Sequence, residues 1–200
     1  MRLYSYVVAH DYGFAPNPFH GVCTLATCKP GIREGASVGD YVVGTGCSRH
    51  KRGGYLIYFM QVGGILTFDQ YWTLPEFQCK RPFLNGSKLR AFGDNIYHRN
   101  PSNGLWVQAN SFHSQPGGSP HPQNIEHDTQ SERVLIGKNY AYWGCAAPKI
   151  PARFRDYKGD DVCKRGQGYR VNFVDGLAED FVAWVEGFKE RGYLGSPLDW

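Results

Sequence analysis

Three polar stretches in the middle of the chain carry the side chains best suited to proton transfer. They are FGDNIYHR at 92–99, NSFHS at 110–114 and IEHD at 125–128. A histidine oriented by a carboxylate can exchange a proton near neutral pH. We therefore predict acid–base roles for Asp94, His113 and His127. Side chains in the same stretches that can bind a polar ligand are Asn95, Tyr97 and Ser114.

A loop rich in glycine and proline, residues 10–46, is the second source of candidate ligands. Prolines flank Asn17 on both sides and fix the backbone there. The Asn17 amide is suited to pair with a base edge, and the alternative is an Asx turn. Lys29 and Arg33 are four residues apart and can hold a phosphate together, the alternative being a solvated basic surface. Asp11 lies in the same loop and completes the predicted substrate-binding set.

No standard metal-binding spacing occurs in the sequence. The six cysteines form no C-x-x-C pair, and they are Cys23, Cys28, Cys47, Cys79, Cys145 and Cys163. We expect reduced, small buried thiols rather than zinc ligands. His113, His121 and His127 with one carboxylate form an alternative metal set, but their spacing matches no known signature. We predict neither a metal nor another cofactor.

Runs of β-branched and aromatic residues between turn residues predict several short strands, at 2–9, 41–43, 55–62, 106–109, 134–137, 140–143 and 169–173. Clear helical periodicity occurs at 176–191, where one apolar face contains Leu177, Phe181, Trp184, Val185 and Phe188. This pattern predicts a single α+β domain over residues 1–200. Its sheet is expected to be mainly antiparallel and barrel-like, with a C-terminal helix.

Composition and charge limit the class of protein. The 200 residues include 42% hydrophobic and 15% aromatic residues, enough for one core. The net charge of +4 suits an anionic ligand but is too weak to indicate nucleic-acid binding alone. No apolar run approaches the ~20 residues of a membrane helix, and MRLYSYVVAH lacks a signal-peptide cleavage site. We expect a cytoplasmic protein without a membrane partner.

A resemblance to a known family rests on several motifs in one order. These are HDYGFAPNPF, CTLATCKPGIR, VGDYVVGTG, GDNIY, a following FHS and VLIGKNYAYWG, between Leu3 and about Pro151. Together they resemble the nucleotide-modification-associated domain, second family, found in bacteria and their phages. The resemblance implies a role in modifying nucleotides or DNA bases. A weaker similarity, to the PUA-like barrels (EVE, ASCH and YTH groups), implies a base held in an aromatic pocket.

These observations predict a protein that modifies or binds a nucleotide or nucleobase in a polar, ring-walled pocket, either free or within DNA. The alternative is a non-catalytic reader of a modified base or signalling nucleotide. Ring candidates are Tyr41, Tyr71, Trp72, Trp106 and Trp143. Both functions require the early loop and the mid-chain segments to line one cavity. The sequence leaves the reaction type and the oligomeric state open.

Overall fold

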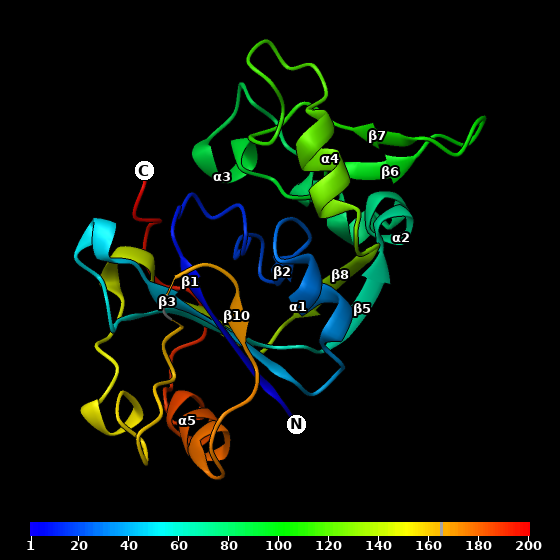
Figure 1. Cartoon of the computed structure of the whole chain (residues 1–200). Coiled ribbons are helices and arrows are strands. Elements are labelled where there is room, and N and C mark those ends of the chain that lie inside the picture. Colours follow the sequence, from blue (N-terminus) through cyan, green and yellow to red (C-terminus); the bar gives the residue numbers. More distant parts are fainter. Residues whose placement is uncertain (165) are drawn as a thin grey trace. The chain divides into compact units, whose positions relative to one another are not determined.

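The computed structural model describes residues 1–164 and 166–200 (Figure 1). Contacts divide the chain into two compact units. Unit 1 comprises Met1–Tyr12, Ala36–Gly63 and Gly137–Trp200, and unit 2 comprises Gly13–Gly35 and Gly64–Ile136. Each unit is therefore assembled from separate stretches of the chain. A single domain over residues 1–200 stays a prediction.

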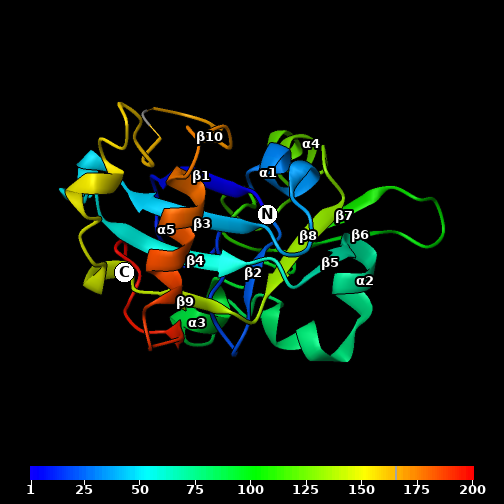
Figure 2. The ribbon, with the colours of Figure 1, turned by 90° about the horizontal axis from the view of Figure 1, so that it is seen from below.

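Unit 1 is built on a six-stranded sheet of order β10-β1-β3-β4-β9-β11. Its strands are β1 (Leu3–Val8), β3 (Tyr41–Gly46), β4 (Leu56–Gln61), β9 (Tyr140–Tyr142), β10 (Tyr169–Arg170) and β11 (Gly192–Tyr193). Helix α5 (Leu177–Glu186) crosses one face of this sheet (Figure 2). It buries Leu177, Phe181 and Val185, the face that the sequence periodicity predicts. The helix is shorter than predicted and is capped at Gly187.

The mixed α/β content is confirmed, and most of the strand pairings are antiparallel as predicted, but the barrel-like closure is not confirmed. Strand β1 pairs with β3 in parallel, and so does β9 with β11. Among the described strands, the sheet ends on β10 and β11 and does not close. The long excursion of the chain between β1 and β3 allows their parallel pairing, because a parallel pair requires a long crossover connection. Local strand patterns do not show how distant strands pair.

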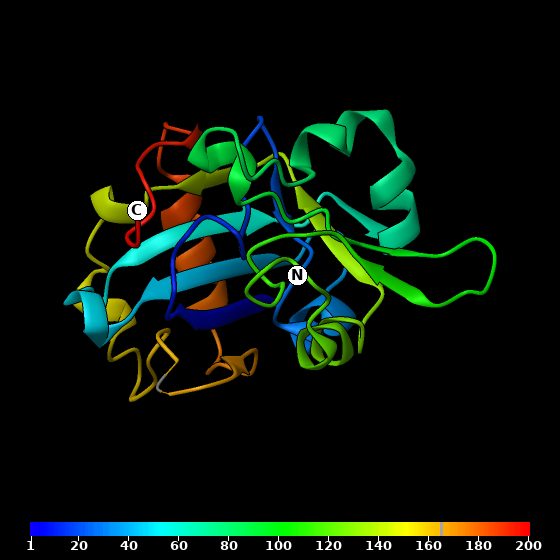
Figure 3. The same ribbon diagram turned by 90° about the horizontal axis from the view of Figure 1, so that it is seen from above.

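Unit 2 contains two small sheets and four short α-helices. One sheet has the order β2-β8-β5, from β2 (Cys23–Leu25), β8 (Arg133–Gly137) and β5 (Gly64–Thr67). The other is the hairpin of β6 (Tyr97–Arg99) and β7 (Trp106–Gln108), whose loop extends from the unit (Figure 3). The helices are α1 (Pro30–Gly35), α2 (Phe68–Thr73), α3 (Lys88–Ala91) and α4 (Pro122–Asp128).

Side-chain capping determines where two of these short helices begin. At α2 the Thr67 hydroxyl accepts a hydrogen bond from the Gln70 N–H, and the Gln70 side chain accepts from the Thr67 N–H. At α4 the His121 imidazole accepts from the Asn124 N–H, and proline follows as the first helical residue. The 3₁₀ helices of the chain are Ser48–His50, Pro75–Lys80, Gly144–Ala146 and Ala152–Phe154.

Two further expectations can be compared with the fold. In the part of the chain that the structure describes, no helix has the length and apolar character to cross a membrane. The cysteines are free, as expected for reduced thiols, but only Cys23 and Cys163 are buried. Cys79 and Cys145 are exposed, while Cys28 and Cys47 are half-buried. The expected burial is therefore found for Cys23 and Cys163 and is wrong for Cys79 and Cys145.

Candidate functional site

The carboxylate of Asp128 gathers four side-chain or backbone donors inside unit 2. Asp128 is the last residue of α4 and is completely buried. Its Oδ1 accepts from the Cys28 N–H at 2.8 Å and lies 3.2 Å from His127 Nδ1. Its Oδ2 accepts from the Tyr97 hydroxyl at 2.9 Å and lies 2.9 Å from His113 Nδ1. Asp128 therefore joins the segment before α1, helix α4, strand β6 and the loop that carries His113.

A thiol completes this arrangement on the other side of the imidazole. The Sγ of Cys28 lies 3.7 Å from Nε2 of His113, whose Nδ1 faces Asp128. Thiol, imidazole and carboxylate thus form a chain of the kind that activates a nucleophile. Cys28 and Lys29 both have positive φ, 55° and 45°. Backbone strain of this kind in residues other than glycine gathers at functional sites.

The local structure holds His113 in place from three directions. Asn124, on α4, donates to the His113 carbonyl at 2.8 Å, and Gln108, on β7, donates to the same oxygen at 3.3 Å. Gln108 pairs across the hairpin with Tyr97 and also donates to the Tyr97 hydroxyl at 3.1 Å. The Ser111 N–H donates to the Ser114 hydroxyl at 3.0 Å, and this hydrogen bond closes the turn that carries His113.

Arg33 fastens α1 to the segment after α4. Its guanidinium is completely buried and donates to the carbonyl oxygens of Cys28 (3.0 Å), Ser131 (2.6 Å) and Arg133 (2.8 Å). It also donates to the carbonyl of Asp128. Helix α4 lies above α1 in the view of Figure 1. Arg33 therefore holds Cys28 next to Asp128, and four of its five N–H donors point at main-chain carbonyls.

The electrostatics favour a charged imidazole beside the sulfur. Burial lowers the pKa of His113, but the hydrogen bonds to Asp128 and Cys28 outweigh it and raise that pKa from 6.5 to about 9. Burial raises the pKa of Asp128, but the bonds from His113 and the Cys28 N–H hold it below its ordinary value. A pKa of about 9 makes His113 an imidazolium at neutral pH, which places a cation beside the Cys28 sulfur.

This protonation makes stability depend on pH in a defined direction. Between pH 6.5 and about 9 the folded protein holds a proton on His113 that the unfolded chain releases. The contribution of His113 is thus fully present below pH 6.5 and is lost as pH rises through about 9. We expect the free energy of unfolding of wild type to fall by on the order of 2–3 kcal/mol over this interval, relative to that of His113→Gln.

Urea denaturation of both proteins at a series of pH values from 6.5 to 9 measures this difference. Taking the difference cancels the contributions of other titrating groups, because both proteins contain them. One such group is Lys80, since burial lowers its pKa to about 8. If the free energies of unfolding of wild type and His113→Gln differ by a constant amount across the interval, the protonation of His113 in the folded protein is contradicted.

Aromatic rings form a wall next to His113. The Phe14 ring lies 4.6 Å from the His113 ring, centroid to centroid. The Phe112 ring contacts Phe14 at 5.6 Å and Phe92 at 5.3 Å, both edge to face. Phe14 is buried, whereas Phe112 is 45% exposed. These phenylalanines, and not the tyrosines and tryptophans expected from the sequence, are the rings beside the imidazole.

A second buried polar cluster in unit 2 contains Asp94. Its carboxylate accepts from the Thr24 and Tyr71 hydroxyls, each at 2.7 Å. Burial raises the pKa of Asp94, against the charge of Lys80 and these hydrogen bonds. The Lys80 ammonium is itself completely buried and donates to Asn17 Oδ1 at 2.7 Å. The cluster has the character of a structural core, because its charges are matched and enclosed.

The predicted site residues therefore separate into three places. His113, His127, Tyr97, Arg33 and Lys29 belong to the surroundings of Cys28 and Asp128, whereas Asp94 and Asn17 belong to the second cluster. The Asn17 amide donates to the carbonyls of Gly13 and Phe92, the Arg33 guanidinium donates to main-chain carbonyls, and Tyr97 is buried. The ligand-binding roles of these three residues stay predictions. Asn95 donates to the carbonyls of Tyr71 and Phe77, and the Ser114 hydroxyl belongs to the Ser111 turn.

Asp11 lies in unit 1, whereas the other predicted site residues belong to unit 2. It is buried, and its carboxylate accepts from the Tyr142 hydroxyl and from the Leu198 N–H at 3.1 Å. Its contacts thus fasten the C-terminal segment, and its role in substrate binding stays a prediction.

Sequence reasoning missed Cys28 and Asp128 as members of the site. The distances from Cys28 to His113 and from His113 to Asp128 follow from the packing of α1, α4 and the intervening loop. The available signal was a cysteine in a glycine- and proline-rich loop, directly before Lys-Pro-Gly, where a helix can begin. A cysteine outside any paired spacing can be a nucleophile as well as a small buried side chain.

The same three residues also have the composition of a metal site. One ligand atom from each of Cys28, His113 and Asp128 lies within 4.8 Å of the others. However, each Asp128 oxygen already has two hydrogen-bonding partners, and His113 Nδ1 is directed at that carboxylate. An ion bound by all three would displace these contacts. The arrangement therefore favours proton transfer over metal binding.

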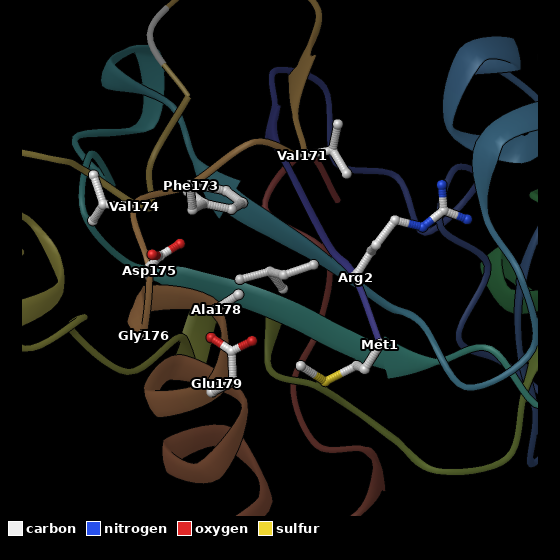
Figure 4. Close-up of a pocket in the computed structure, with 10 residues that line it drawn as sticks. Met1, Arg2, Val171, Phe173, Val174, Asp175, Gly176, Ala178 and Glu179 are labelled. Carbon is white, nitrogen blue, oxygen red and sulfur yellow. The ribbon is translucent and has the colours of Figure 1, made fainter.

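Unit 1 has a hollow of about 390 Å³ between the start of β1 and the start of α5 (Figure 4). The carboxylates of Asp175 and Glu179 lie on one side of it, and the Arg2 side chain extends away from them. The Arg2 guanidinium is paired with Asp40 at 3.0 Å. This hollow lacks a nucleophile with a neighbouring base, so we place the candidate chemistry at Cys28.

Comparison with known proteins supplies the family. Neither the curated proteins nor the solved structures contain a match, so the PUA-like similarity is unconfirmed. A family model described as nucleotide modification associated domain 2 matches residues 1–200, the whole chain, and this confirms the resemblance carried by the sequence motifs. The chain belongs to the nucleotide modification associated domain 2 family.

Proposed function

We propose that this protein is an enzyme of nucleotide modification that uses Cys28 as its nucleophile. His113 is the general base and acid, and Asp128 orients and charges His113. The observation that carries the proposal is the chain of contacts from Cys28 Sγ to His113 Nε2 at 3.7 Å and from His113 Nδ1 to Asp128 at 2.9 Å. The family's role supports a nucleotide or a DNA base as the substrate.

The reaction class that suits this arrangement is acyl transfer from a carbonyl group attached to the nucleotide or base. The Cys28 thiolate attacks the carbonyl carbon, and a C–S bond forms. The C–N or C–O bond to the leaving group breaks as His113 Nε2 donates its proton to that group. Water or an amine then gives a proton back to His113 and attacks the thioester, which releases the Cys28 thiolate.

Two neighbouring residues have supporting roles in this proposal. Burial lowers the pKa of Lys29, while the charge of Cys28 raises it, so its ammonium lies within electrostatic reach of the sulfur. We assign Lys29 to the phosphate of the substrate. His127 contacts the second Asp128 oxygen, and its side chain is 56% exposed. We assign it to holding the carboxylate, as a positioning residue.

The test is product formation from pools of nucleotides and DNA carrying acylated or amide-linked bases, followed by mass spectrometry. We expect wild type to form a product and Cys28→Ala to form none. Cys79→Ala is the matched control, because Cys79 is an exposed cysteine of unit 2 whose Sγ contacts the Glu76 carbonyl. A mass increase on Cys28 in the intact protein would identify the thioester.

Three results would overturn the proposal. Equal product yields from wild type and Cys28→Ala would place the chemistry elsewhere. Ligand-induced thermal stabilisation with no product from any pool would favour the non-catalytic reader. Activity that is lost with a chelator and restored by zinc would assign Cys28, His113 and Asp128 to a metal.

A further inference from the structure

Phe112 is an exposed aromatic side chain directly next to the proposed base. Its side chain is 45% exposed, although most other phenylalanines of unit 2 are buried or half-buried. Its ring is close to parallel with the His113 ring, at 29° and 6.3 Å between centroids. Exposing such a ring has a cost in free energy, which a bound apolar surface would recover.

The Phe112 ring is held in a fixed orientation. Phe14 and Phe92 contact it edge to face, at 5.6 and 5.3 Å. The turn that carries it is closed by the hydrogen bond from Ser111 to Ser114 at 3.0 Å. A ring fixed in this way loses little conformational freedom when a ligand stacks on it.

The charges around Phe112 select the kind of planar ligand. His113 follows it in sequence, and its imidazole is a cation in the hydrogen-bonded chain with Asp128. A planar group joined to an anion would use the ring and this neighbouring cation together, and a nucleotide has this chemistry.

We propose that Phe112 is the platform on which the nucleobase stacks, and that this contact places the rest of the substrate against Cys28. The inference rests on the proposed function and names the residue that holds the base. Stacking uses the face of a base, which all bases share, so the platform accepts purines and pyrimidines alike.

Equilibrium binding of the four deoxynucleoside monophosphates and of a short single-stranded oligonucleotide tests the platform. Phe112→Ala is expected to weaken binding roughly 5- to 150-fold, the effect of losing one stacked base. Phe112→Trp should retain binding, and its indole fluorescence should be quenched by the ligand. Phe83→Ala is the matched control, because Phe83 is 49% exposed in the same unit and contacts Arg90.

The outcomes separate this inference from the proposed function. Alkylation of Cys28 by iodoacetamide should proceed at the same rate in Phe112→Ala as in wild type, because the ring is outside the hydrogen-bonded chain. Unchanged nucleotide binding in Phe112→Ala, an equal loss in Phe83→Ala, or no binding by wild type would each overturn the platform. The alkylation rate is measured independently of nucleotide binding and tests Cys28 and His113 by themselves.

Discussion

Replacing Asp128 by alanine is expected to lower the free energy of unfolding by about 3–5 kcal/mol, the cost of removing one partner from a buried charged network. The carboxylate is completely buried and serves the Cys28 N–H, Tyr97, His113 and His127. Its loss leaves these donors without an acceptor and leaves the imidazolium of His113 unmatched. Chemical denaturation of wild type and variant at neutral pH measures the difference.

Glu126→Ala is the control for this prediction. Glu126 lies two residues earlier on the same helix and is exposed. Its removal should change stability by less than about 0.5 kcal/mol, as surface substitutions usually do. If Asp128→Ala were no more destabilising than Glu126→Ala, Asp128 would not be the centre of the network, and the proposed orientation of His113 would have no support.

Replacing His113 by glutamine is expected to lower the rate of product formation by about 10²–10⁴, the usual contribution of a general acid–base residue. Glutamine retains polarity near Cys28 and Asp128 but cannot carry the proton between the sulfur and the leaving group. The measurement is initial rates in the nucleotide-pool assay, with folding monitored by thermal denaturation.

His98→Gln is the matched variant for this second prediction. His98 is also in unit 2, but its ring stacks on Trp72 at 4.3 Å instead of facing a thiol. Product formation should be unchanged in this variant. A reduced rate in both variants, or in neither, would remove His113 from the mechanism.

The sequence predicted most strands of unit 1 because their signals are local. Residues 2–9 and 55–62 are apolar runs bounded by turn residues, and they form β1 and β4. The C-terminal helix was predicted from its buried face, which contains Leu177, Phe181 and Val185. The short helices of unit 2 were not predicted, because four to seven residues give less than two turns of periodicity.

The candidate site was predicted in part, for a related reason. His113 was identified by its type, because an imidazole is suited to proton transfer wherever it lies. Its carboxylate partner is Asp128 rather than Asp94, and its sulfur partner is Cys28, 85 residues earlier in the chain. Asp94 was selected from the same residue-type argument, but its position decides its role, because it is enclosed with Thr24 and Tyr71. Residue type identifies candidates, and packing selects among them.

Competition of the cysteines for one reagent tests whether His113 and Asp128 activate Cys28. Intact wild-type protein is treated with limiting iodoacetamide at neutral pH, and alkylation of each cysteine is followed by mass spectrometry. Exposure alone ranks Cys79 and Cys145 above the half-buried Cys28. We expect the reverse, with Cys28 alkylated first and its advantage lost in His113→Gln. Alkylation of Cys28 after the exposed cysteines, or at the same rate in His113→Gln, would contradict it.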